Sequence, residues 1–199
     1  PQAPAQGEVG ASVLDLKLQL VLDVTLHDAA AGWRGVEERV FLTKRRGESL
    51  DHVLMKLCGW LLFYHPELRI ELSAEQHYKP DLVRLDERGD PVQWIDCGHT
   101  ALRKLDRIAS KNRKTTIDII KPVERELRLF KAAADEKIAR PERVRYFAFR
   151  EGFLEELGTR VRGRHQLIAT VTGAQESLDL AIDPETDDAT EISTPIIRL

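Results

Sequence analysis

The chain has 199 residues, of which 42% are hydrophobic and 32% are charged, and its formal net charge is -3. This length and composition are typical of a soluble globular protein, so we expect a single domain over residues 1–199. A nearly balanced charge excludes an overall attraction to nucleic acid or to a membrane, and any such contact must come from a local patch. Cys58 and Cys97 indicate neither a metal site nor a disulfide framework, which favours a cytoplasmic setting.

The first half of the chain opens with two segments of β-type alternation. They predict strands at residues 13–24 and 36–42, which we expect to form a hairpin beside the core. From Ser49 the hydrophobic residues take helical spacing instead. The sequence therefore predicts a helix over residues 49–64 that is capped by Ser49 and ended by Pro66.

Residues 79–98 have the pattern of two short strands joined by a polar turn. If a four-residue loop closes this turn, Val83 faces Trp94 and Leu85 faces Val92, so that one face of the hairpin is apolar. A shift of two residues would preserve the faces, whereas a shift of one would break the apolar pairing.

The same register places Asp81 opposite Asp96 at the open end of the hairpin, with their Cβ atoms roughly 5 Å apart. Two like charges at that separation repel by roughly 3 kcal/mol at an effective dielectric constant of about 20. We therefore expect a shared proton, a basic side chain or a bound cation to offset the repulsion. The alternative is that both acids are structural. Asp96 would then pair with a nearby Arg or Lys, and Asp81 would simply open a strand after Pro80.

The remainder of the chain alternates helices and strands. The segment at residues 176–191 carries seven acids and no Lys or Arg, so we expect it to end in an exposed tail. Helices are expected at residues 100–112, where Thr100 can cap, and at 123–134 and 151–157; strands are expected at 69–74, 114–120, 144–149, 166–172 and 178–182.

The order helix, three strands, helix, strand over residues 49–120 resembles the core of the PD-(D/E)xK nuclease superfamily, with Pro-Asp opening the second strand and an acid near the end of the third. More narrowly, four short motifs look like those of YaeQ family proteins, and the resemblance covers residues 48–122. These motifs are Gly47-Glu48-Ser49, Pro80-Asp81-Leu82, Trp94-Ile95-Asp96-Cys97-Gly98 and Arg103-Lys104.

The resemblance implies an α/β fold with a mixed β-sheet flanked by helices, a restriction-endonuclease-like core, and additional N-terminal and C-terminal β-regions. It also implies a divalent-metal phosphodiesterase site, in which Asp81, Asp96 and Glu48 hold Mg²⁺ or Mn²⁺. The sequence departs from the superfamily pattern at Gly98, where the motif lysine is expected. Lys104 is the first candidate to replace that lysine, and Arg103 is the second.

A row of basic residues follows the expected helix at 100–112. Arg103, Arg107 and Lys111 recur at intervals of four, and residues 101–114 carry six basic side chains against one acid, Asp106. Together with Lys114, this row is a candidate nucleic-acid surface that would hold a phosphate backbone without sequence preference. The plainer interpretation is a solvated helix face.

Two functional hypotheses follow from the sequence. The first is a metal-dependent phosphodiesterase that acts on nucleic acid, or a degenerate relative that keeps the metal site. The second is a noncatalytic module that binds nucleic acid or a protein through the basic helix or the acidic segment. No membrane partner is expected, because no run of the sequence approaches the length of a membrane span. The sequence does not identify a protein partner.

Overall fold

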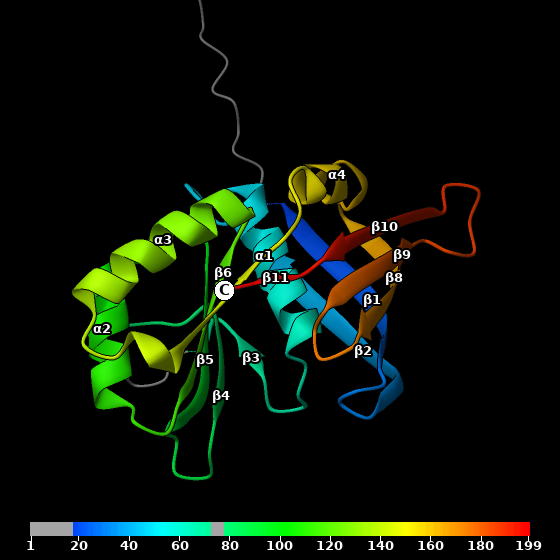
Figure 1. Cartoon of the computed structure of the whole chain (residues 1–199). Helices are drawn as coiled ribbons and strands as arrows, with labels where there is room; N and C mark the ends of the chain where they lie inside the picture. The colour runs from blue at the N-terminus through cyan, green and yellow to red at the C-terminus, as the bar shows by residue number, and fades with distance from the viewer. Residues whose placement is uncertain (1–17, 73–77) are drawn as a thin grey trace, which may run out of the picture.

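The computed structural model describes residues 18–72 and 78–199, which form two β-sheets with helices between them and on one outer side (Figure 1). The first sheet has five strands in the order β10-β9-β8-β1-β2. Its strands are β1 (Gln19–Asp28), β2 (Trp33–Thr43), β8 (Arg164–Thr172), β9 (Ser177–Ile182) and β10 (Thr190–Pro195).

The second sheet has six strands in the order β11-β7-β6-β5-β4-β3, and it is mixed, because β5, β6 and β7 run parallel while their neighbours are antiparallel. Its strands are β3 (Arg69–Ile70), β4 (Leu82–Leu85), β5 (Pro91–Cys97), β6 (Thr116–Lys121), β7 (Val144–Ala148) and β11 (Ile197–Arg198).

Helix α1 (Leu50–Leu62) lies between the two sheets (Figure 1). Every residue from 53 to 62 is buried, as expected of a helix that is covered on all sides. The predicted cap is confirmed, since the Ser49 hydroxyl accepts a hydrogen bond from the His52 amide at 3.1 Å. Helix α4 (Phe153–Arg160) packs against α1 and β10.

Helices α2 (Leu102–Lys111) and α3 (Glu124–Lys137) cover the opposite face of the six-stranded sheet, where a second hydrophobic cluster forms. A short 3₁₀ helix, Pro141–Arg143, leads from α3 into β7. The prediction that Thr100 caps α2 is wrong. The N-cap residue is Ala101, which offers no side-chain hydrogen bond, and the buried Thr100 hydroxyl has no hydrogen-bond partner in the described part of the chain.

The predicted order of elements over residues 49–120 is confirmed, since α1, β3, β4, β5, α2 and β6 follow one another. The register of the hairpin is confirmed as well, because Val83 pairs with Trp94. Beyond Arg84 the register shifts by one residue, so that Leu85 lies opposite Pro91 and not Val92.

Strands β1 and β2 share one sheet with β8, β9 and β10, which the sequence did not predict. The expected N-terminal hairpin exists as β1 and β2, but β1 also pairs in parallel with β8. The end of the acidic segment is exposed at residues 185–189, as expected, but it is a turn and not a tail, because the chain continues into β10, which pairs with β9. Residues 13–17 and 73–74 of the predicted strands lie outside the described residues. Within the described ranges, no helix is long and apolar enough to cross a membrane.

Candidate functional site

The β4–β5 hairpin brings Asp81 and Asp96 to one end of the six-stranded sheet. Asp81 immediately precedes β4, and its amide donates to the Ile95 carbonyl at 3.1 Å, which continues the ladder of the hairpin by one residue. Oδ2 of Asp81 accepts a hydrogen bond from the Cys97 amide at 2.7 Å. This bond ties the Asp81 carboxylate to the end of β5, the strand that carries Asp96.

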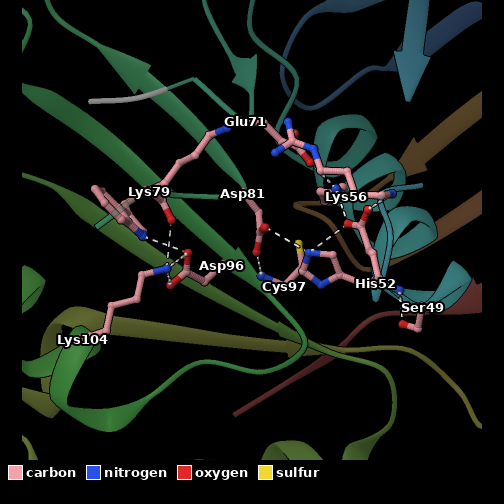
Figure 2. A network of polar contacts seen from close by, with 12 residues as sticks. Ser49, His52, Lys56, Glu71, Lys79, Asp81, Asp96, Cys97 and Lys104 are labelled. Carbon is pink, nitrogen blue, oxygen red and sulfur yellow. Dashed lines mark hydrogen bonds and ion pairs between the residues drawn. The ribbon is translucent and has the colours of Figure 1, made fainter. Parts of the chain in front are cut away.

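Helix α1 contributes His52 to the Asp81 side of the site (Figure 2). Nε2 of His52 lies 3.1 Å from Oδ1 of Asp81. Burial alone would raise the pKa of Asp81, but the hydrogen bonds from His52 and the Cys97 amide outweigh it and lower this pKa. An ionised carboxylate only accepts, so Nε2 of His52 must carry the proton, and the bond to Asp81 raises the pKa of His52.

Asp96 lies on the other side of Asp81 and is only 1% exposed (Figure 2). Nζ of Lys104, from the first turn of α2, lies 2.9 Å from its Oδ1 and 2.8 Å from its Oδ2, although only the contact with Oδ1 has hydrogen-bond geometry. The Trp94 indole also donates to Oδ1, at 3.1 Å. Burial raises the pKa of Asp96, and the opposing effect of Lys104 is smaller.

A second set of charged groups continues the site along α1. The Lys56 ammonium, whose side chain is 1% exposed, lies 2.6 Å from Oε1 of Glu48 and 2.5 Å from Oε1 of Glu71. Arg45 completes the cluster by pairing with Glu71 and by donating its amide to Oε2 of Glu48 at 2.9 Å. Nε2 of His52 lies 3.4 Å from Glu48, so His52 joins this cluster to Asp81.

The predicted ligands are therefore brought near one another but are not arranged as one triad. Asp81 and Asp96 are neighbours, whereas Glu48 is paired with Lys56 and reaches Asp81 only through His52. Among the residues that the structure describes, no three His, Cys, Asp or Glu side chains form a group that could hold a metal ion.

A sequence model of the YaeQ protein family matches residues 34–185, which is well over half of the chain. The chain belongs to the YaeQ family. Its fold is similar to the crystal structure of the YaeQ protein from Xanthomonas axonopodis pv. citri, with a TM-score of 0.75 at 16% identity over 92% of this chain and 97% of that one. The YaeQ protein from Pseudomonas syringae gives a TM-score of 0.72 at 13% identity over 92% and 96%. No curated protein matches the chain.

In this YaeQ family chain, the backbone explains why residue 98 is glycine. Gly98 has a φ of +67°, a left-handed conformation that side chains rarely adopt. A Cβ atom at this position would lie 3.0 Å from Cε of Met55 and 3.4 Å from Nδ1 of His52. A lysine here would have a strained backbone and a Cβ directed toward α1.

Sequence reasoning overlooked three residues of the site: His52, Lys56 and Glu71. A signal for the first two exists, because His52 and Lys56 follow Glu48 at intervals of four, the spacing of residues on one face of a helix, although Glu48 itself precedes α1. Glu71 has no comparable signal. It adopts a φ of +55° and donates its amide to the Asp81 carbonyl at 2.7 Å, a placement that depends on the tertiary fold.

The basic row of this YaeQ family protein follows the outer face of α2, opposite its buried residues, and all four predicted members are exposed. Arg103 lies at the end of α2 nearest Asp96. Lys111 and Lys114 lie at the far end, where they line a hollow together with Arg88 and Arg113 of the neighbouring loops. The row thus runs from the carboxylate site toward the turn between β4 and β5.

Proposed function

We propose that this protein is a divalent-metal-dependent phosphodiesterase of the PD-(D/E)xK type that acts on nucleic acid. The observation that carries the proposal is the placement of Asp81, Asp96 and the Lys104 ammonium together at the end of the β4–β5 hairpin. Two acids and one lysine thus meet at the end of the hairpin, even though Gly98 occupies the usual lysine position. A restriction-endonuclease-like core is part of the same proposal.

The donor chemistry of this pair fits Mg²⁺ or Mn²⁺. These ions prefer oxygen ligands and are commonly held by one or two carboxylates together with water and substrate phosphate. Asp81 and Asp96 would supply the carboxylates, and Oδ2 of Asp96 makes no hydrogen bond within the described structure. Glu48 would act as a supporting group through His52, because Lys56 already neutralises it. When bound, the metal polarises the scissile phosphate and favours ionisation of an attacking water.

The remaining roles belong to side chains on α2. Lys104 is 20% exposed, and in this proposal its ammonium moves from Asp96 to the phosphate and stabilises the charge that develops there. Arg103, on the exposed side of the same turn, is the second candidate for this role. Arg107, Lys111 and Lys114 would hold the neighbouring backbone phosphates.

Calorimetric titration with Mg²⁺ and Mn²⁺ should show binding by the parent protein that disappears in Asp81→Ala and Asp96→Ala. Metal-dependent cleavage of labelled DNA or RNA should fall in the same variants by at least about a hundredfold, since both carboxylates are needed to hold the ion. Asp187→Ala, in the exposed turn before β10, serves as the matched control and should behave like the parent. The metal proposal fails if the parent protein binds neither ion.

A noncatalytic nucleic-acid-binding or protein-binding module is the second candidate. It is favoured by the observation that the site already neutralises itself, since Asp81 is paired with His52 and Asp96 with Lys104. Nucleic-acid binding without metal binding or cleavage would support this candidate over the first.

The basic row is tested by charge reversal. Arg107→Glu combined with Lys111→Glu should weaken nucleic-acid binding and lower the slope of log affinity against log salt by about 2, because two phosphate contacts are lost. The matched control is Lys137→Glu with Arg140→Glu, which changes the charge equally at two exposed positions, the last residue of α3 and the loop after it. Fluorescence anisotropy at several salt concentrations measures both quantities. An unchanged slope would mean that the row is only a solvated face.

A further inference from the structure

Lys121, the last residue of β6, lies on the same face of the sheet as Asp96. Strands β5 and β6 are parallel, with Asp96 opposite Ile119 and Cys97 opposite Ile120. Side chains alternate between faces, so Lys121 projects from the same face as Ile119 and Asp96. The register places it directly beside Gly98, the position that carries no side chain.

The Lys121 ammonium is buried, and the described residues provide no counterion for it. The residue is 6% exposed, its Nζ donates to the Gly98 carbonyl, and it lies 4.0 Å from the centre of the Phe130 ring of α3. In the described part of the chain, no carboxylate lies within ion-pair distance of it. Burial lowers the pKa of Lys121, while Glu126 and Asp96 oppose this from farther away.

An unpaired buried ammonium is costly, and one carbonyl and one aromatic ring offset that cost only in part. The other buried lysine among the described residues, Lys56, has two carboxylate partners at hydrogen-bond distance. The contrast indicates that Lys121 lacks an anion which the folded chain does not supply. A site beside Asp96 that takes a phosphate would supply it.

We propose that Lys121 is a second cationic residue of the site and binds a nonbridging phosphate oxygen of nucleic acid beside Gly98. The inference rests on the proposed function for the identity of the anion, but it needs neither a bound metal nor turnover. In this arrangement Lys104 neutralises Asp96, and Lys121 meets the phosphate from the neighbouring strand.

Binding of fluorescein-labelled single-stranded and double-stranded DNA to the full chain, measured without added metal, tests the assignment. Lys121→Met should weaken the affinity by about tenfold, as expected for the loss of one charge-assisted hydrogen bond, and Lys121→Arg should retain most of it. Lys137→Met, at the exposed end of α3, is the control for loss of one positive charge and should change the affinity much less.

Thermal melting separates binding from a structural role. If Lys121 serves binding, Lys121→Met should melt at the same temperature as the parent or higher. Methionine has a shape similar to that of lysine and removes the buried charge. A lower melting temperature with unchanged DNA affinity would overturn the proposal and make Lys121 a structural residue. Absence of DNA binding by the parent would overturn it too.

The outcomes also separate this inference from the metal site. Weaker DNA binding in Lys121→Met, combined with no Mg²⁺ or Mn²⁺ binding by the parent, would support Lys121 and reject the metal. Metal binding by the parent, combined with unchanged DNA affinity in Lys121→Met, would support the metal site and reject the role of Lys121.

Discussion

Lys56→Met should lower the free energy of unfolding by about 3–5 kcal/mol near pH 7, which is typical of removing one partner from a buried ion pair. Lys56 has a fully buried side chain between Glu48 and Glu71, whose side chains are 12% and 23% exposed. Methionine has a similar volume but removes the cation that lies between the two carboxylates, although Glu71 keeps another cationic partner, Arg45. Urea unfolding monitored by circular dichroism measures the loss.

The loss of stability in Lys56→Met should depend on pH. Burial lowers the pKa of Lys56, but its bonds to Glu48 and Glu71 outweigh this and raise it above 10.5. Burial raises the pKa of Glu71, but Lys56 lowers it below 4.5. The cluster therefore stabilises the fold fully between about pH 4.5 and 10.5, and this contribution disappears as the pH falls through the folded pKa of Glu71 or rises through that of Lys56.

The difference in the free energy of unfolding between Lys56→Met and the parent should therefore become smaller in acid. Lys131→Met breaks an i, i+4 pair with Asp135 on the surface of α3 and provides the comparison, with an expected loss below about 1 kcal/mol. Equal losses in the two variants would show that the buried cluster contributes no more than a surface pair.

Gly98→Lys, which places a lysine two residues after Asp96, should destabilise the protein by about 1–3 kcal/mol and should not increase metal-dependent cleavage. A non-glycine residue at a φ of +67° is strained, and the new Cβ would press on Met55 and His52. Displacing His52 would also disturb its bond to Asp81.

Gly98→Ala separates the effect of the backbone strain and the Cβ contacts from the effect of the ammonium group. Alanine has the same backbone strain and the same Cβ contacts but no ammonium group, so both variants should lose similar stability in urea unfolding. A gain of cleavage in Gly98→Lys that is absent from Gly98→Ala would contradict the assignment of the lysine role to Lys104.

The local patterns of the sequence were sufficient for the hairpin and for the helices. Alternation around a polar turn predicts that Val83 pairs with Trp94, and that pairing alone brings Asp81 to Asp96. The capping serine and the apolar run after it predict α1. The parallel pairing of β1 with β8 was not predictable in this way, because no local pattern specifies which distant strand is a neighbour.

The site shows the same division between local and tertiary information. Asp81, Asp96 and Lys104 follow from motif order. Of the three expected ways to offset the acid pair, namely a shared proton, a basic side chain or a bound cation, the Lys104 contact is the second. Lys56 was overlooked because it lies within an apolar helix that is buried on every face. Such a helix has no polar face on which a functional charged residue would be expected. Its partner Glu71 comes from the far side of a loop, and only the folded chain brings the two together.

The pairing of β1 with β8 has a consequence for how the protein is made. Val21 is hydrogen-bonded across strands to the segment around Arg164, so the five-stranded sheet is complete only after β8, β9 and β10 have left the ribosome. Until then, α1 and the inner face of β1 and β2 have no cover from β8, β9 and β10. Such long-range pairing slows folding and leaves apolar surface open to chaperones or aggregation during synthesis.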